Sequence, residues 1–110
     1  MKVGIIRCKQ TEDFCSATND FKAIRNKTGG FEGIEEEIEL YGVNSCGGCP
    51  GKKAVFRAKE MVSRGADTIA FASCITKGNP IDFACPFAKK MISAVQNAVG
   101  DDIRIIDHTH

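Results

Sequence analysis

The chain has 110 residues, of which 43% are hydrophobic and 26% are charged, and its formal net charge is +1. This composition is typical of a globular protein, and the length suits one domain spanning residues 1–110. A nearly neutral chain has no general electrostatic attraction for nucleic acid or for an anionic membrane. No apolar run approaches the ~20 residues of a membrane span, and the run at residues 3–6 is too short for a signal peptide. We therefore expect a cytoplasmic protein.

Six cysteines are the unusual feature of this composition. A reducing cytosol argues against three structural disulfides, so metal binding or thiol redox chemistry explains them better. Single cysteines also occur as small buried hydrophobic residues, but this explanation is unattractive for all six together.

Short apolar runs alternate along the chain with amphipathic segments. Strands are predicted at residues 3–7, 35–45, 68–73 and 103–106, and helices at residues 16–27, from Pro50 to Gly65, and from Cys85-Pro86 to Gly100. The first and third strands are almost wholly apolar and are expected inside the sheet. The second alternates apolar and acidic residues, which is typical of an edge strand.

The alternation of strands and helices predicts right-handed crossovers and a parallel sheet. We therefore predict a small doubly wound α/β fold. It has about four strands in the order 2-1-3-4, with helices on both faces.

The segment Cys46-Gly47-Gly48-Cys49-Pro50 joins the second strand to the second helix. Proline suits the first position of a helix, and Gly65 is placed to end this helix. Cys49 is therefore predicted at the helix N-cap, where the helix dipole stabilises a thiolate as a nucleophile or as a metal ligand. Cys85-Pro86 repeats this arrangement at the next helix.

Cysteine or histidine follows every predicted strand. Residues that follow parallel strands collect at the carboxyl edge of the sheet, where open α/β sheets bind ligands. The ligand candidates expected at this edge are Cys8, Cys46, Cys49, Cys74, Cys85 and His110. Cys15 is expected on the same side, and His108 is interpreted as an exposed residue.

Two functions compete for these residues. Thiolates with one imidazole suit zinc, and an all-thiolate set also suits an iron–sulfur cluster. The paired CxxC motifs of ribbon-type zinc sites are absent, so the fold would have to assemble the site. A CxxC before a helix is also typical of thioredoxin-like proteins, but there the helix begins inside the motif, whereas here Pro50 follows it.

Metal binding, with zinc preferred, is therefore the first hypothesis, and a thiol–disulfide oxidoreductase or redox sensor using Cys46 and Cys49 is the alternative. A carrier that delivers metal or sulfur to a partner is a third. No phosphate loop, acid–base pair or cofactor fingerprint is present, so no reaction or catalytic residue is predicted. The basic side chains of the second helix are expected to be solvated, with anion binding near Lys52 and Lys53 as the alternative.

Several blocks resemble the CGGC domain family, and the resemblance covers nearly the whole chain. These blocks are residues 6–8, 11–15, 45–53, 72–78 and 107–110. The family consists of small prokaryotic proteins, many from anaerobes and archaea, and is regarded as metal binding because of its cysteines and histidines. Its biochemical function is not established. In the family pattern a histidine often follows the Cys-Pro pair, where this chain has Phe87, which leaves His110 as the favoured imidazole.

Overall fold

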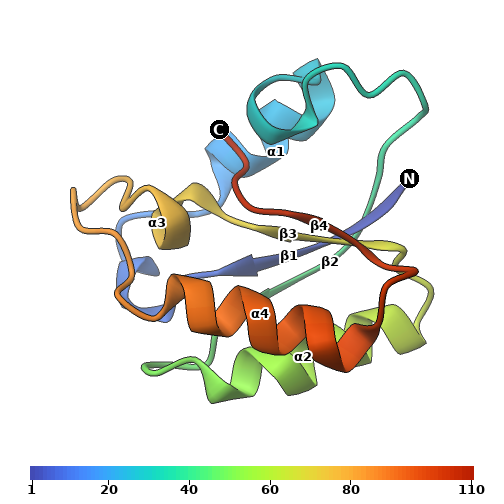
Figure 1. The fold of residues 1–110 in the computed structure, drawn as a ribbon. Coiled ribbons are helices and arrows are strands. Elements are labelled where there is room, and N and C mark those ends of the chain that lie inside the picture. Colours follow the sequence, from blue (N-terminus) through green and yellow to red (C-terminus); the bar gives the residue numbers. More distant parts are fainter.

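The computed structural model describes residues 1–110 and is built around a four-stranded parallel sheet (Figure 1). Its strands are β1 (Lys2–Arg7), β2 (Glu39–Ser45), β3 (Thr68–Phe71) and β4 (Arg104–Ile106). Their order is β2-β1-β3-β4, so the predicted fold class and strand order are confirmed. The apolar strands β1 and β3 lie inside the sheet, and β2 is an edge strand, as their sequence patterns predict.

Helices cover both faces of the sheet (Figure 1). Helix α1 (Thr18–Asn26) lies on one face, whereas α2 (Lys52–Ser63) and α4 (Ala88–Val99) pack side by side on the other. The shorter elements are helix α3 (Ser73–Thr76) and the 3-10 turns η1 (Lys9–Thr11) and η2 (Gly29–Phe31). None of the helices is long and apolar enough to cross a membrane.

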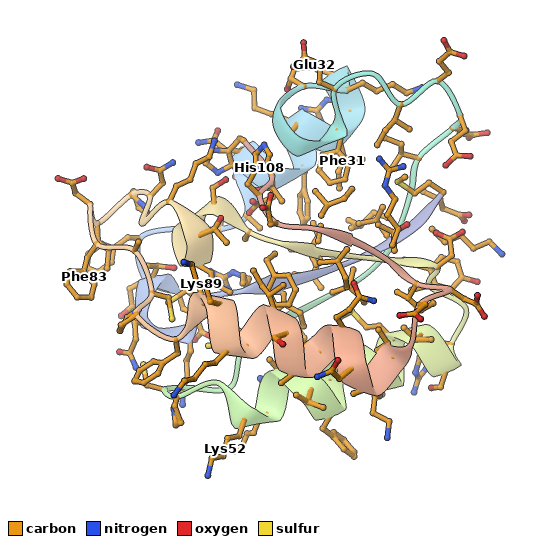
Figure 2. All side chains as sticks on the ribbon, viewed as in Figure 1. Phe31, Glu32, Lys52, Phe83, Lys89 and His108 are labelled. Carbon is orange, nitrogen blue, oxygen red and sulfur yellow. The ribbon has the colours of Figure 1, made fainter.

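The core lies on both sides of the two central strands. Ile5, Ile69 and Phe71 are fully buried, and Phe31 of η2 fills the side that faces α1 (Figure 2). Each such side chain stabilises the fold by about 2 kcal/mol through removal of apolar surface from water. This burial fixes the sheet, and with it the position of every residue that follows a strand.

Both helices that follow the Cys-Pro pairs begin later than predicted. Helix α2 begins after Gly51, whose φ of +88° lies outside the helical region, so Gly51 is its N-cap. Helix α4 has Phe87 as its N-cap, and Cys85 lies before it, with its amide donating to the carbonyl of Ile75 at 2.8 Å. The predictions that Cys49 and Cys85 are N-cap residues are therefore wrong, and both lie in the preceding turns.

Strands β2 and β3 are shorter than predicted. The carbonyls of Glu35 and Glu36 accept hydrogen bonds from Lys27 Nζ at 3.1 and 2.9 Å, so this segment does not join the sheet. Strand β3 ends at Phe71 because Ser73 starts α3. As a result, Cys74 lies within a short helix beyond the end of the strand.

Candidate functional site

The carboxyl edge of the sheet carries two groups of polar and sulfur-containing side chains. We call the first the thiol cluster; it consists of Cys8, Cys46, Cys49, Cys74 and Cys85. The second, the His110 pocket, lies beside α1 and contains Cys15 and His110. All six cysteines are free thiols.

Cys8 and Cys74 meet where β1 and β3 end. The backbone amide of Cys8 donates a hydrogen bond to Cys74 Sγ at 3.2 Å. Burial raises the pKa of the Cys74 thiol, and the Cys8 amide and the hydroxyl of Thr11 only partly offset this rise. Burial therefore favours the protonated thiol of Cys74 over its thiolate.

Cys85 joins the cluster from the loop that precedes α4. Burial raises the pKa of its thiol, the amide of Phe87 lowers it, and negative charge on Cys49, Cys8 and Cys46 raises it. Cys85 therefore lies on the same side of the sheet as these three cysteines, and its own amide donates to the carbonyl of Ile75 in α3 at 2.8 Å.

The CGGC segment contributes one buried and one exposed thiol. Cys46 is buried, and its amide donates to the carbonyl of Arg7 at 2.7 Å, which holds it beside the end of β1. Gly47 and Gly48 have φ values of +81° and +108°, a conformation that glycine adopts without strain. The chain turns sharply there, and Cys49 reaches the solvent.

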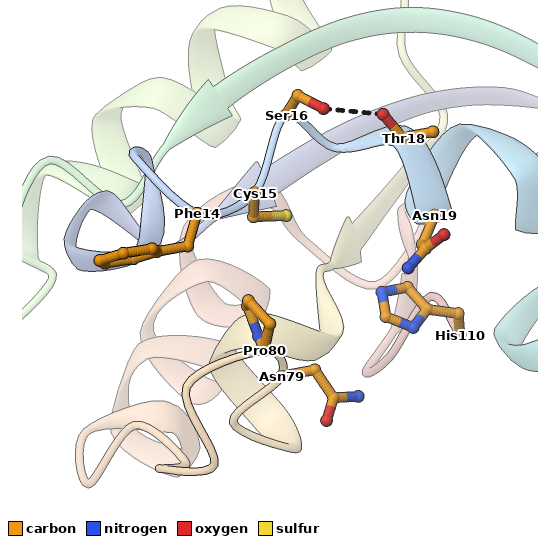
Figure 3. A pocket seen from close by; sticks show the side chains of 8 residues that line it. All are labelled: Phe14, Cys15, Ser16, Thr18, Asn19, Asn79, Pro80 and His110. Carbon is orange, nitrogen blue, oxygen red and sulfur yellow. Dashed lines mark hydrogen bonds between the residues drawn. The ribbon is translucent and has the colours of Figure 1, made fainter.

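The His110 pocket is a cavity of about 150 Å3 (Figure 3). Its walls come from the segment before α1, the first turn of α1, the loop after α3, and residue 110. The lining residues are Phe14, Cys15, Ser16, Thr18, Asn19, Asn79, Pro80 and His110. Polar side chains predominate, so this cavity differs in character from the thiol cluster.

The buried carboxylate of Asp20 lies next to His110. Asp20 is 1% exposed, and its Oδ1 accepts a hydrogen bond from the hydroxyl of Thr109, while Oδ2 has no protein partner. His110 Nε2 lies 3.8 Å from Asp20 Oδ1. The amide of His110 donates to Ser73 Oγ at 2.9 Å, so the backbone here is tied to α3.

Asp20 is not among the ligands predicted from the sequence, although the sequence contains a signal for it. Asp20 stands between Ala17 and Ile24, which are both buried, at the spacing of one helical face. A charged residue on an apolar face indicates a buried, partnered carboxylate. His108, predicted to be exposed, keeps 34% of its side chain accessible, and its Nδ1 lies 2.8 Å from Asp107 Oδ1.

The profile of the CGGC domain matches residues 2–110. The chain belongs to the CGGC domain family. The domain is 40% identical over 80 residues to an uncharacterized protein of Methanocaldococcus jannaschii, with 67% of this chain and 62% of that protein covered. A second uncharacterized protein of the same organism is 34% identical over 55 residues, with 49% of this chain and 79% of that protein covered. The chain thus spans less than two thirds of the first relative, and no solved structure matches it.

The donor chemistry of the CGGC domain suits a soft metal ion, because its thiols gather at one edge of the sheet. Five of the six predicted ligands belong to the thiol cluster, whereas the ring of His110 lines the other pocket. No three Cys, His, Asp or Glu side chains have the mutual spacing of a metal site. A complete ligand set therefore requires the thiols to turn towards a common point, and the assignment of particular ligands stays a prediction.

Proposed function

We propose that this CGGC domain binds a metal ion, zinc in preference to an iron–sulfur cluster, through its thiol cluster. The observation that carries the proposal is the grouping of cysteines from four separate segments at one edge of the sheet, where the amide of Cys8 donates to Cys74 Sγ and backbone hydrogen bonds hold Cys46 beside β1 and Cys85 beside α3. Membership of a family with this cysteine pattern is consistent with it. Thiolates of this kind are the preferred ligands of structural zinc sites.

The proposed ligand set has a fixed part and an adjustable part. Cys8, Cys74 and Cys85 are held by backbone hydrogen bonds at or near the ends of β1 and α3. Cys49 is exposed and follows two glycines with positive φ, so it is the adjustable member of the set. These four thiolates would complete a tetrahedral site. Cys46 and His110 are the alternatives for the fourth position.

Metal analysis of protein purified without oxygen tests this proposal. We expect about one zinc ion per chain, the stoichiometry of a single four-ligand site. Cys74→Ser removes a central ligand and should reduce the zinc content to below ~0.2 per chain, since structural sites need their full ligand set. Cys15→Ser is the matched control, because Cys15 lies in the His110 pocket, and it should retain the metal.

The proposal fails if the unmodified protein holds less than ~0.2 metal ions per chain and stays there after reconstitution with zinc, or with iron and sulfide. An absorption spectrum separates the two metals, because zinc thiolates are colourless in the visible range and iron–sulfur clusters are not.

A second function, thiol–disulfide exchange, is favoured by one observation: Cys49 is exposed, whereas Cys46 is buried. Exchange needs an accessible attacking thiol and a second thiol close in the chain. It predicts a reversible Cys46–Cys49 disulfide in a redox titration. A Cys46→Ser protein with an unchanged titration would exclude it.

A further inference from the structure

A groove of about 590 Å3 runs between α2 and α4 on the face of the sheet opposite α1. Its apolar lining comes from Pro50, Val55, Phe87, Met91 and Ala94. Gly51 packs closely against Met91 at the floor of the groove, since a Cβ at residue 51 would lie 2.6 Å from Met91 Cε. Volumes of ~300–1,000 Å3 with mainly apolar walls are typical of sites for small organic molecules.

The charged groups of the groove all have one sign. Lys52 and Lys90 line it, and no acidic residue does. Figure 2 shows Lys52 and Lys89, the neighbour of Lys90, at the first turns of the two helices. Both helices begin at this end, so their dipoles add to the positive potential. A ligand with an apolar body and one anionic group would match both the walls and the charge.

The length of the groove limits the size of its occupant. On α4 the lining residues run from Phe87 to Ala94, which spans ~10 Å at the rise of an α-helix. On α2 they run only from Lys52 to Val55, about one turn. A peptide helix needs a longer groove, so the dimensions fit a small molecule the size of two fused rings.

We propose that this groove binds a small organic anion whose apolar body lies against Phe87 and Met91 and whose carboxylate or sulfonate pairs with Lys52 and Lys90. The site is independent of the proposed metal. It adjoins the thiol cluster, because Pro50 directly follows Cys49 and the amide of Phe87 contacts the Cys85 thiol. A bound anion therefore lies next to these two thiols.

A pair of fluorescent probes tests the proposal with the whole chain. 1-Anilinonaphthalene-8-sulfonate carries the predicted anion on a naphthalene body, and N-phenyl-1-naphthylamine has the same body without the charge. The double variant Lys52→Gln/Lys90→Gln should weaken binding of the sulfonate about tenfold, from two ion pairs of ~0.7 kcal/mol, and leave the neutral probe unchanged.

Ala94→Trp fills the groove and should weaken binding of both probes about tenfold or more. Lys22→Gln, an exposed charge on α1, is the matched control and should change neither affinity. The sulfonate should also raise the melting temperature, because a ligand of the native state stabilises it. Wild-type affinity in Ala94→Trp, or a melting temperature lowered by the probe, would overturn the proposal.

Discussion

The thiol cluster and the His110 pocket are the two halves of the carboxyl edge, and they bring together different kinds of side chain. The thiol cluster is formed by residues after β1 and β2, in α3 and in the loop before α4, whereas the His110 pocket is formed around α1 on the other face. The first consists of thiols, and the second combines the Cys15 thiol with hydroxyl, amide, imidazole and carboxylate groups. The common direction of the strands thus places these residues at one edge, and the face of the sheet decides which of them meet.

The halves touch through α3. Ser73 holds the segment of Thr109 and His110, and its neighbour Cys74 accepts the amide of Cys8. The negative charge of Asp20 also acts on the Cys74 thiol. Substitutions in one half therefore test whether the two halves are energetically separate. Substitutions on the α1 side should lower stability and leave metal binding at the thiol cluster intact.

The largest effect on stability is expected from Gly30→Ala. A Cβ at residue 30 would lie 2.0 Å from the backbone oxygen of His108, so the segment that carries His110 must shift. Overpacking against backbone should cost about 3 kcal/mol in the free energy of unfolding, measured by urea denaturation. Gly33→Ala is the control: φ is +80° there but the space is open, so about 1 kcal/mol is expected. Loss of zinc in Gly30→Ala would show that the halves are coupled.

A smaller effect is expected from Thr109→Val. This change removes the hydroxyl that donates to Asp20 and that accepts the Ser73 amide at 3.1 Å, and it leaves both groups buried without a partner. The cost should be about 2 kcal/mol by urea denaturation. Thr109→Ser retains the hydroxyl and should recover most of the stability that Thr109→Val loses. Equal stabilities of the valine and serine variants would contradict the assigned role of this hydrogen bond.

The smallest effect is expected at the opposite edge of the sheet. Burial raises the pKa of Asp67, but hydrogen bonds from the Lys2 amide and the Thr68 hydroxyl lower it further, to below its ordinary value of 3.8. A carboxylate with a lowered pKa in the folded state stabilises the protein above its ordinary pKa, and this contribution is lost as the pH falls through the folded value.

Asp67→Asn should therefore destabilise the protein near neutral pH, and the difference should shrink in strong acid. Because Asp67 is exposed, the effect should stay below about 1 kcal/mol. Unfolding curves at several pH values check this. A constant difference between the two proteins at every pH would contradict the assigned shift.

The sequence predicted the sheet well because the relevant signals are local. The apolar runs of β1 and β3, the alternation in β2 and the helices between them determine the order that the structure confirms. Helix starts were harder to predict. The conformation of Gly51 and the hydrogen bond between Cys85 and Ile75 depend on tertiary contacts, which periodicity does not report.

The sequence predicts only the edge of the sheet at which the candidate site lies. The sequence predicts that Cys8, Cys46, Cys49 and Cys74 follow strands and that Cys85 lies on the same side of the sheet. The separation of the His110 ring from the thiols could not be predicted, because it depends on the hydrogen bonds of Thr109 and Ser73, residues far apart in the chain. Asp20 can be recognised in the sequence as a charged residue on an apolar helix face, but its partner Thr109 cannot.

X-ray absorption at the metal edge of zinc-loaded protein tests the central claim most directly. A site built from the thiol cluster predicts a first shell of sulfur alone at ~2.3 Å, unchanged in His110→Ala. A nitrogen contribution at ~2.0 Å that disappears in His110→Ala would contradict the separation of the two halves, and would place His110 among the ligands.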